Sequence, residues 1–192
     1  EALRQPLENK TVHISRAQYA VEFPASFLFV AALNPCPCGY HSDASKRCSC
    51  SPQAIENYLG KLSGPLLDRI DLHVHVASLS YDEMKTEAVR EKTSAEMKAE
   101  VDAARAFRHA RQGDIPNGLL APDQIQVFCV LTDGAESLVK KMFDRLGLSM
   151  RSYHKILKLA RTIADFEISD VIHEHHLKEA FSYRCFDRQK GS

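Results

Sequence analysis

Residues 27–39 have the sequence FLFVAALNPCPCG, in which an apolar run ends at Asn34 and two cysteines follow directly. The run is apolar on both faces, as is typical of a central parallel strand that helices cover on either side. We therefore expect a buried strand over residues 27–33, followed by a loop that carries Cys36 and Cys38. A strand of this kind indicates an α/β core.

A second cysteine pair, Cys48 and Cys50, follows the first after nine residues. Four thiolates suit tetrahedral Zn²⁺ and leave no open position, so the ion would be structural. One residue separates the cysteines of each pair where two is usual, and His41 is a substitute ligand. Reduced thiols or a redox disulfide are the alternative interpretations. The predicted zinc ligands are Cys36, Cys38, Cys48 and Cys50.

The bulk composition is that of an ordinary globular protein, with 192 residues, 44% of them hydrophobic. Lys plus Arg and Asp plus Glu number 25 each, so nucleic-acid binding would need local patches or an oligomer. No apolar run approaches the roughly 20 residues that span a bilayer. We expect a cytoplasmic protein without a membrane partner. The start at Glu1 and the end at Gly191-Ser192 suggest a fragment.

The periodicity of the chain predicts two domains. Residues 1–112 are expected to be α/β, with strands at 11–17 and 70–76, a turn region at 19–24, a short helix within 57–67 and a cysteine-rich loop at 34–51. Residues 113–192 are expected to form a helical lid. Capping boxes at Ser80/Glu83 and Thr93/Glu96 predict two helices before the boundary.

Helix caps and stops organise the predicted lid. Thr132 or Asp133 caps a helix that Gly147 ends, and Ser149 caps the next, strongly amphipathic helix. A final helix is expected from His173 to Phe186. The histidines at 173–176 indicate a solvated helix start rather than a metal site. Cys129 and Cys185 are expected to be buried free thiols.

Three polar residues are candidate nucleotide contacts. Asn34 ends the expected strand, and ligands of α/β folds bind at that end, although an Asn there also satisfies local backbone groups. Arg69 forms a local salt bridge on a solvated turn or is presented to a neighbouring subunit's nucleotide. Arg151 lies in the first turn of its expected helix, where its positive charge is unfavourable beside the positive end of the helix dipole. A phosphate or a nearby carboxylate would compensate that charge.

Several motifs resemble, in order, those of the magnesium-chelatase-like AAA+ ATPases, and in particular the YifB/ComM branch. They are LRQPLE at 3–8, ISRA at 14–17, FPA-x-F at 23–27, NPCPCG at 34–39, LSGPLLDRIDL at 62–72, LS-x-R-x-YH-x-IL at 148–157 and ARTIAD at 160–165. The resemblance covers almost the whole chain. It implies the second half of an AAA+ α/β core, with a partial parallel sheet and a pre-sensor-1 hairpin, followed by a C-terminal helical lid.

The resemblance also implies roles for the three residues. Asn34 matches sensor 1, which orients the attacking water, and Arg69 matches an arginine finger that acts across a homohexamer interface. Arg151 matches sensor 2, which contacts the γ-phosphate of its own or a neighbouring subunit. Residues 11–24 match the hairpin that touches DNA in the central pore, with His13, Arg16 or Tyr19 at its tip.

In the family branch the activity is an ATP- and Mg²⁺-dependent helicase and branch-migration activity on single-stranded or branched DNA during natural transformation and recombination. The chain lacks a Gly-x-x-x-x-Gly-Lys-Ser/Thr loop, and the family's Walker A and B motifs lie upstream of Glu1. We therefore expect this part alone to be inactive. The alternatives are a protein or metal-insertion remodelling ATPase of the magnesium-chelatase type, and a stand-alone zinc-binding interaction module.

Overall fold

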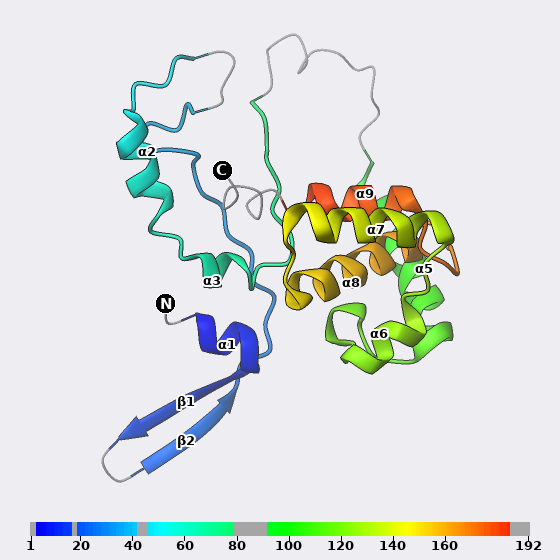
Figure 1. The fold of residues 1–192 in the computed structure, drawn as a ribbon. Coiled ribbons are helices and arrows are strands. Elements are labelled where there is room, and N and C mark those ends of the chain that lie inside the picture. The colour runs from blue at the N-terminus through cyan, green and yellow to red at the C-terminus, as the bar shows by residue number, and fades with distance from the viewer. Residues whose placement is uncertain (1–2, 17–18, 42–45, 79–91, 185–192) are drawn as a thin grey trace. The chain divides into compact units, whose positions relative to one another are not determined.

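A computed structural model describes residues 3–16, 19–41, 46–78 and 92–184. The chain divides into two compact units, one of residues 1–70 and 75–79 and the other of residues 71–74 and 80–192 (Figure 1). The domain boundary expected after residue 112 stays a prediction.

The first unit begins with a short helix and a hairpin. α1 (Arg4–Asn9) leads into β1 (Thr11–Arg16), which pairs antiparallel with β2 (Tyr19–Pro24). The hairpin confirms the expected strand after residue 11. The expected turn region at 19–24 is wrong, because these residues form the second strand of the hairpin.

The described residues of this unit do not form the partial parallel sheet that was expected. In the described parts of the chain, β-pairing is limited to the two-stranded sheet of β1 and β2 and to an isolated bridge between Leu131 and Ile172 in the second unit. Residues 27–33 and 71–76 form no strand there, and the side chains of Leu28 and Val30 are 90% and 81% exposed. A strand exists only where a neighbour pairs with its backbone, and β1 and β2 pair with each other.

Two short helices follow the cysteine loop. They are α2 (Pro52–Leu59), capped by the Ser51 side chain, and α3 (Gly64–Leu67), capped by the Ser63 side chain. The sequence predicted one helix that breaks near Pro65. Pro65 instead lies in the first turn of α3. The N–H groups of a first turn have no acceptor within the helix, so proline loses no hydrogen bond there, and its fixed φ suits the helix.

The second unit is helical, as expected for the second half of the chain. Its elements are α5 (Ser94–Gln112), the 3₁₀ turn η1 (Asn117–Leu119), α6 (Pro122–Phe128), α7 (Asp133–Leu146), α8 (Met150–Phe166) and α9 (Glu174–Ser182). The capping box of Thr93 and Glu96 starts α5 as predicted. The Ser80/Glu83 box lies outside the described residues.

α8 is the helix around which this unit packs, since α5, η1, α6 and α9 all contact it. Thr132 caps α7, Gly147 ends it with a left-handed φ of 56°, and Ser149 caps α8, all as predicted. The buried apolar core consists of Leu120, Ile125, Cys129, Ala135, Val139, Ile156, Leu157, Ala160, Ala164, Ile172, Leu177, Ala180 and Phe181. Among the described residues, no helix is both long enough and apolar enough to cross a membrane.

Candidate metal centre and nucleotide-contacting residues

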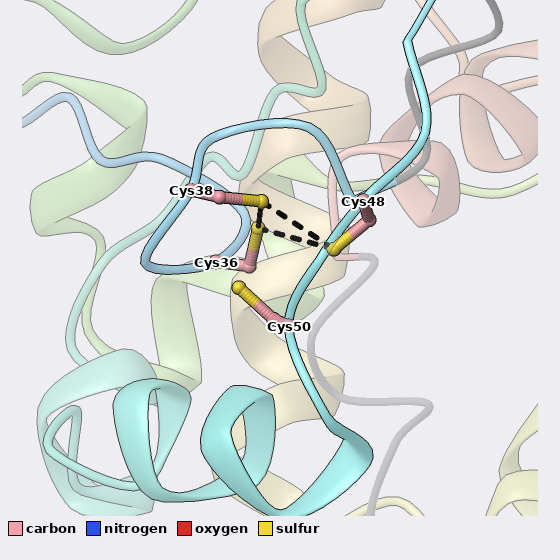
Figure 2. A group of neighbouring side chains, drawn as sticks. All are labelled: Cys36, Cys38, Cys48 and Cys50. Carbon is pink, nitrogen blue, oxygen red and sulfur yellow. Dashed lines mark hydrogen bonds between the residues drawn. The ribbon is translucent and has the colours of Figure 1, made fainter.

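Four cysteine sulfurs meet in the first unit. Cys36 and Cys38 come from the loop after the apolar run, while Cys48 and Cys50 precede α2, and the four side chains point into one small space (Figure 2). The Sγ atom of Cys36 lies 3.3 Å from that of Cys38 and 3.7 Å from that of Cys48. All four Sγ atoms lie within 4.8 Å of one another. The two pairs therefore converge as the spacing predicted.

The loop geometry that brings the sulfurs together depends on Gly39. The Gly39 N–H donates to the Cys36 carbonyl over 3.0 Å, and the residue has a φ of +85°, which L side chains rarely adopt. The resulting turn folds the chain back toward Asn34, because a Cβ built on Gly39 would lie 4.0 Å from the Asn34 Cγ. The turn thus places the metal-binding pattern beside the candidate sensor residue.

The electrostatics of the cluster favour a bound cation. Backbone hydrogen bonds from Tyr40 and Ser49, together with the Cys36 side chain, lower the pKa of Cys38 to about 5. A hydrogen bond with the Cys38 backbone lowers the pKa of Cys50, but burial and the other three sulfurs outweigh it and raise that pKa to about 12. Cys38 is thus ready to bind as a thiolate, whereas the raised pKa values of Cys48 and Cys50 show that these two thiols resist ionisation while no positive charge compensates them.

The dimensions also fit zinc. With Zn–S bonds of about 2.3 Å, tetrahedral geometry separates the sulfurs by about 3.8 Å. The Cys36–Cys48 and Cys38–Cys48 sulfur pairs, at 3.7 and 3.5 Å, are close to this value. The cysteines are unbonded thiols rather than disulfides. A four-thiolate set with these separations can hold Zn²⁺, and it would leave no position for substrate.

Arg69 follows α3 and is largely buried, with 12% of its side chain exposed. Its Nη1 donates to the Pro65 carbonyl over 2.6 Å, and its Nη2 forms an ion pair with Glu8 of α1. The solvated local salt bridge that the sequence suggested with Asp68 or Asp71 is therefore not the contact observed. Asp71 instead pairs with Lys155, at 2.7 Å.

Arg151 lies in the first turn of α8, directly after the cap formed by Ser149. The side chain is exposed, and the first turn of α8 contains no acidic residue. Arg151 belongs to the second unit, whereas Asn34 and Arg69 belong to the first. The nucleotide-contacting roles of Asn34, Arg69 and Arg151 stay predictions.

A buried ionic cluster in the second unit was not foreseen. Asp165 of α8, 2% exposed, pairs with Arg111 at the end of α5, with a second contact of 3.0 Å, and with Arg161, which is fully buried. Asn117 donates to Asp165 over 2.7 Å. The sequence contains one signal for this cluster, an Arg and an Asp four residues apart on an amphipathic helix. The same spacing is typical of ion pairs on a helix surface, so the sequence did not show that this pair is buried.

A second group of possible metal ligands starts α9. Glu167 accepts hydrogen bonds from His175 at 2.8 Å and from His176 at 3.0 Å. The Nδ1 atom of His176 accepts the His173 N–H over 2.9 Å, so its Nε2 carries the proton given to Glu167 and offers no lone pair. Burial lowers the pKa of His176, although its hydrogen bond with Glu167 opposes that effect. This group confirms the expected helix start, but the expected solvation is wrong for His176, whose ring caps α9 and is fully buried.

Of the two other cysteines, Cys129 is a buried free thiol whose pKa burial raises to about 11. Cys185 lies outside the described residues. Cys129 thus confirms the expectation of an inert core thiol.

Comparison with known proteins covers nearly the whole chain. The family model described as magnesium chelatase, subunit ChlI, matches residues 1–84, and the model for the C-terminal part of the same subunit matches residues 91–184. Competence protein ComM of Haemophilus influenzae is 42% identical over 188 residues, which are 98% of this chain and 36% of that protein.

Two further relatives carry the name YifB. Those of Escherichia coli and Salmonella typhimurium are 39% and 38% identical, again over 98% of this chain and 37% of each relative. The chain therefore spans little more than a third of the length of these relatives.

Proposed function

Since the chain belongs to the magnesium-chelatase-like family, in the branch of ComM and YifB, we propose that it is the sensor- and finger-bearing part of an AAA+ ATPase that remodels DNA. In this proposal the full-length protein binds ATP and Mg²⁺ and assembles as a homohexamer. Its DNA is single-stranded or branched, and its role is branch migration in natural transformation and recombination. Its place of action is the cytoplasm.

The nucleotide chemistry is divided among three residues of this chain. MgATP, when bound, supplies the phosphoryl group and the metal charge. Asn34 orients the attacking water, while the Arg69 guanidinium stabilises the charge that builds on the transferring group. Arg151 holds a phosphate at the positive end of α8, where an anion is favoured. The phosphate cradle and the Mg²⁺ ligands are assigned to parts of the full-length protein outside these 192 residues.

The observation that carries the DNA-binding part of the proposal is the exposed hairpin of β1 and β2. The last pair of its register is Arg16 opposite Tyr19, and the Tyr19 side chain is 72% exposed. An exposed aromatic ring beside a guanidinium is the combination on which single-stranded bases stack. His13 pairs with Glu22 further back along the strands, so the suggestion that it lies at the tip is wrong.

The test is ATP hydrolysis by the full-length protein with and without single-stranded and forked DNA. We expect DNA to stimulate hydrolysis. Tyr19→Ala should raise the DNA concentration for half-maximal stimulation by about five- to 150-fold, the loss of one stacked base. Tyr19→Phe, which keeps the ring, should behave like the wild type.

Phe23→Ala, at the base of the same hairpin face, is the matched control for general damage to the hairpin. An ATP hydrolysis rate that DNA does not change would favour an ATPase that remodels a protein or a metal-insertion complex. A full-length protein without any hydrolysis would favour the stand-alone zinc-binding interaction module.

We also propose that the four-cysteine cluster binds structural Zn²⁺, supported by the converging sulfurs and the low pKa of Cys38. The purified protein should contain stoichiometric zinc by elemental analysis. Cys50→Ser should lose it, whereas Cys129→Ser, which changes a thiol of the helical core, should retain it. Chelation should expose residues 36–50 to proteases and leave the helical unit intact. First cleavage within the helical unit would contradict this prediction.

A further inference from the structure

The side chain of Arg69 is held within its own chain by two hydrogen-bonded contacts. Both terminal nitrogens are engaged, Nη1 with the Pro65 carbonyl and Nη2 with the carboxylate of Glu8. The contact with Glu8 joins the end of α3 to α1, two helices whose contacting residues are 61 positions apart in the sequence; Figure 1 shows where both helices lie. A phosphate that approaches the Nη2 side of this guanidinium competes with Glu8 for it.

The retracted position is only partly satisfied. The Nε atom of Arg69 is buried and has no hydrogen-bond partner among the described residues. A guanidinium presents its donors in a rigid fork that matches the oxygens of a phosphate, whereas a single carboxylate oxygen and a carbonyl use only part of that fork. An incoming phosphate therefore offers Arg69 more acceptors and more negative charge than Glu8 does.

We propose that Glu8 is a positioning residue that holds Arg69 retracted until a nucleotide phosphate on a neighbouring copy displaces it. This inference rests on the proposed function, since it takes Arg69 as the finger. Glu8 suits the role because 38% of its side chain is exposed, so its carboxylate is readily solvated when Arg69 departs. The exchange replaces one charge-assisted ion pair by another and needs no further chemistry.

The first experiment measures the retraction directly, without ATP. In the full-length protein, Glu8→Gln removes the charge and keeps the shape. Modification of Arg69 by phenylglyoxal, followed by mass spectrometry, should become about tenfold faster, as expected from weakening one hydrogen bond to a charged group. Glu8→Asp should modify more slowly than Glu8→Gln. The control Glu56→Gln alters an exposed glutamate on α2 of the same unit and should leave the rate unchanged.

The second experiment follows steady-state ATP hydrolysis without DNA. Glu8→Gln should raise kcat several-fold, up to about tenfold, with KM for ATP unchanged. It should have no effect in the Arg69→Ala background, because the pair acts as one unit. Thermal melting is measured in parallel for every variant.

The outcomes separate the two ideas. An unchanged modification rate in Glu8→Gln, or a kcat that falls together with the melting temperature, would overturn the role of Glu8 and leave a structural link between α1 and α3. Neither result bears on the proposed role of Arg69 as the arginine finger. If Arg69→Ala hydrolyses ATP like the wild type, the proposed function of Arg69 fails, and the role of Glu8 fails with it.

Discussion

Arg69→Ala is expected to lower the kcat for ATP hydrolysis by the full-length protein by about 10³- to 10⁵-fold. The reason is electrostatic, because a phosphoryl transition state spreads negative charge over its oxygens, and a guanidinium placed there costs no reorganisation during reaction. KM for ATP should change little if the finger acts mainly in the transition state. The measurement is steady-state hydrolysis with and without DNA.

Two variants and a mixture make this result specific. Arg69→Lys keeps the charge but loses the fork, so it should recover only part of the rate. Arg105→Ala, which removes an exposed arginine of α5, should hydrolyse ATP like the wild type. If the finger acts in trans, mixing Arg69→Ala subunits with Asn34→Ala subunits should restore activity at some interfaces.

The contrary result is just as clear. Wild-type hydrolysis by Arg69→Ala, with a lower melting temperature, would make Arg69 a structural residue that binds Glu8 and the Pro65 carbonyl. Mixed assemblies that stay inactive would instead place its action within its own subunit.

Asp165→Ala should destabilise the helical unit by about 3–5 kcal/mol, since it leaves one buried and one half-buried guanidinium group without their shared carboxylate. Arg161 is fully buried and Arg111 is 17% exposed, so water cannot fully replace the lost partner. Burial already lowers the pKa of Arg161, and Asp165 opposes that effect. The Asn117 amide would lose an acceptor as well.

Urea unfolding of the 192-residue chain measures this effect. Far-UV circular dichroism is the suitable probe, because the chain has no Trp and the helical unit dominates the signal. Asp144→Ala, an exposed aspartate of α7, is the matched control and should change stability by no more than about 0.5 kcal/mol. A cost below about 1 kcal/mol for Asp165→Ala would mean that solvent reaches the cluster.

Predictions that rested on short-range chemistry agree with the structure. The capping box at Thr93, the caps at Thr132 and Ser149 and the stop at Gly147 each depend on groups within four residues of one another, so the sequence contains all that is needed. The convergence of the cysteine pairs is similar, because a short loop with Gly39 at its turn leaves the pairs few other positions.

The strand predicted at residues 27–33 failed because it required distant partners. The run at 27–33 has the apolar pattern of a buried strand, but a pattern supplies no neighbour, and Leu28 and Val30 remain exposed in this chain. The turn placed at 19–24 was an error of another kind. The residue pattern alone missed the strand, whereas the family resemblance implied a hairpin over residues 11–24, and β1 pairs with β2 as a hairpin requires.

The sequence by itself determined the family, the helical second half, the four metal-ligand candidates and the three residues proposed to contact nucleotide. Only the tertiary structure decided which acidic side chain forms the ion pair with each arginine. Arg69 has two aspartates within two positions and yet pairs with Glu8, while Arg111 pairs with an aspartate 54 positions away. Charge alone makes every such pairing allowed, and the packing of helices selects one by setting which side chains are buried together.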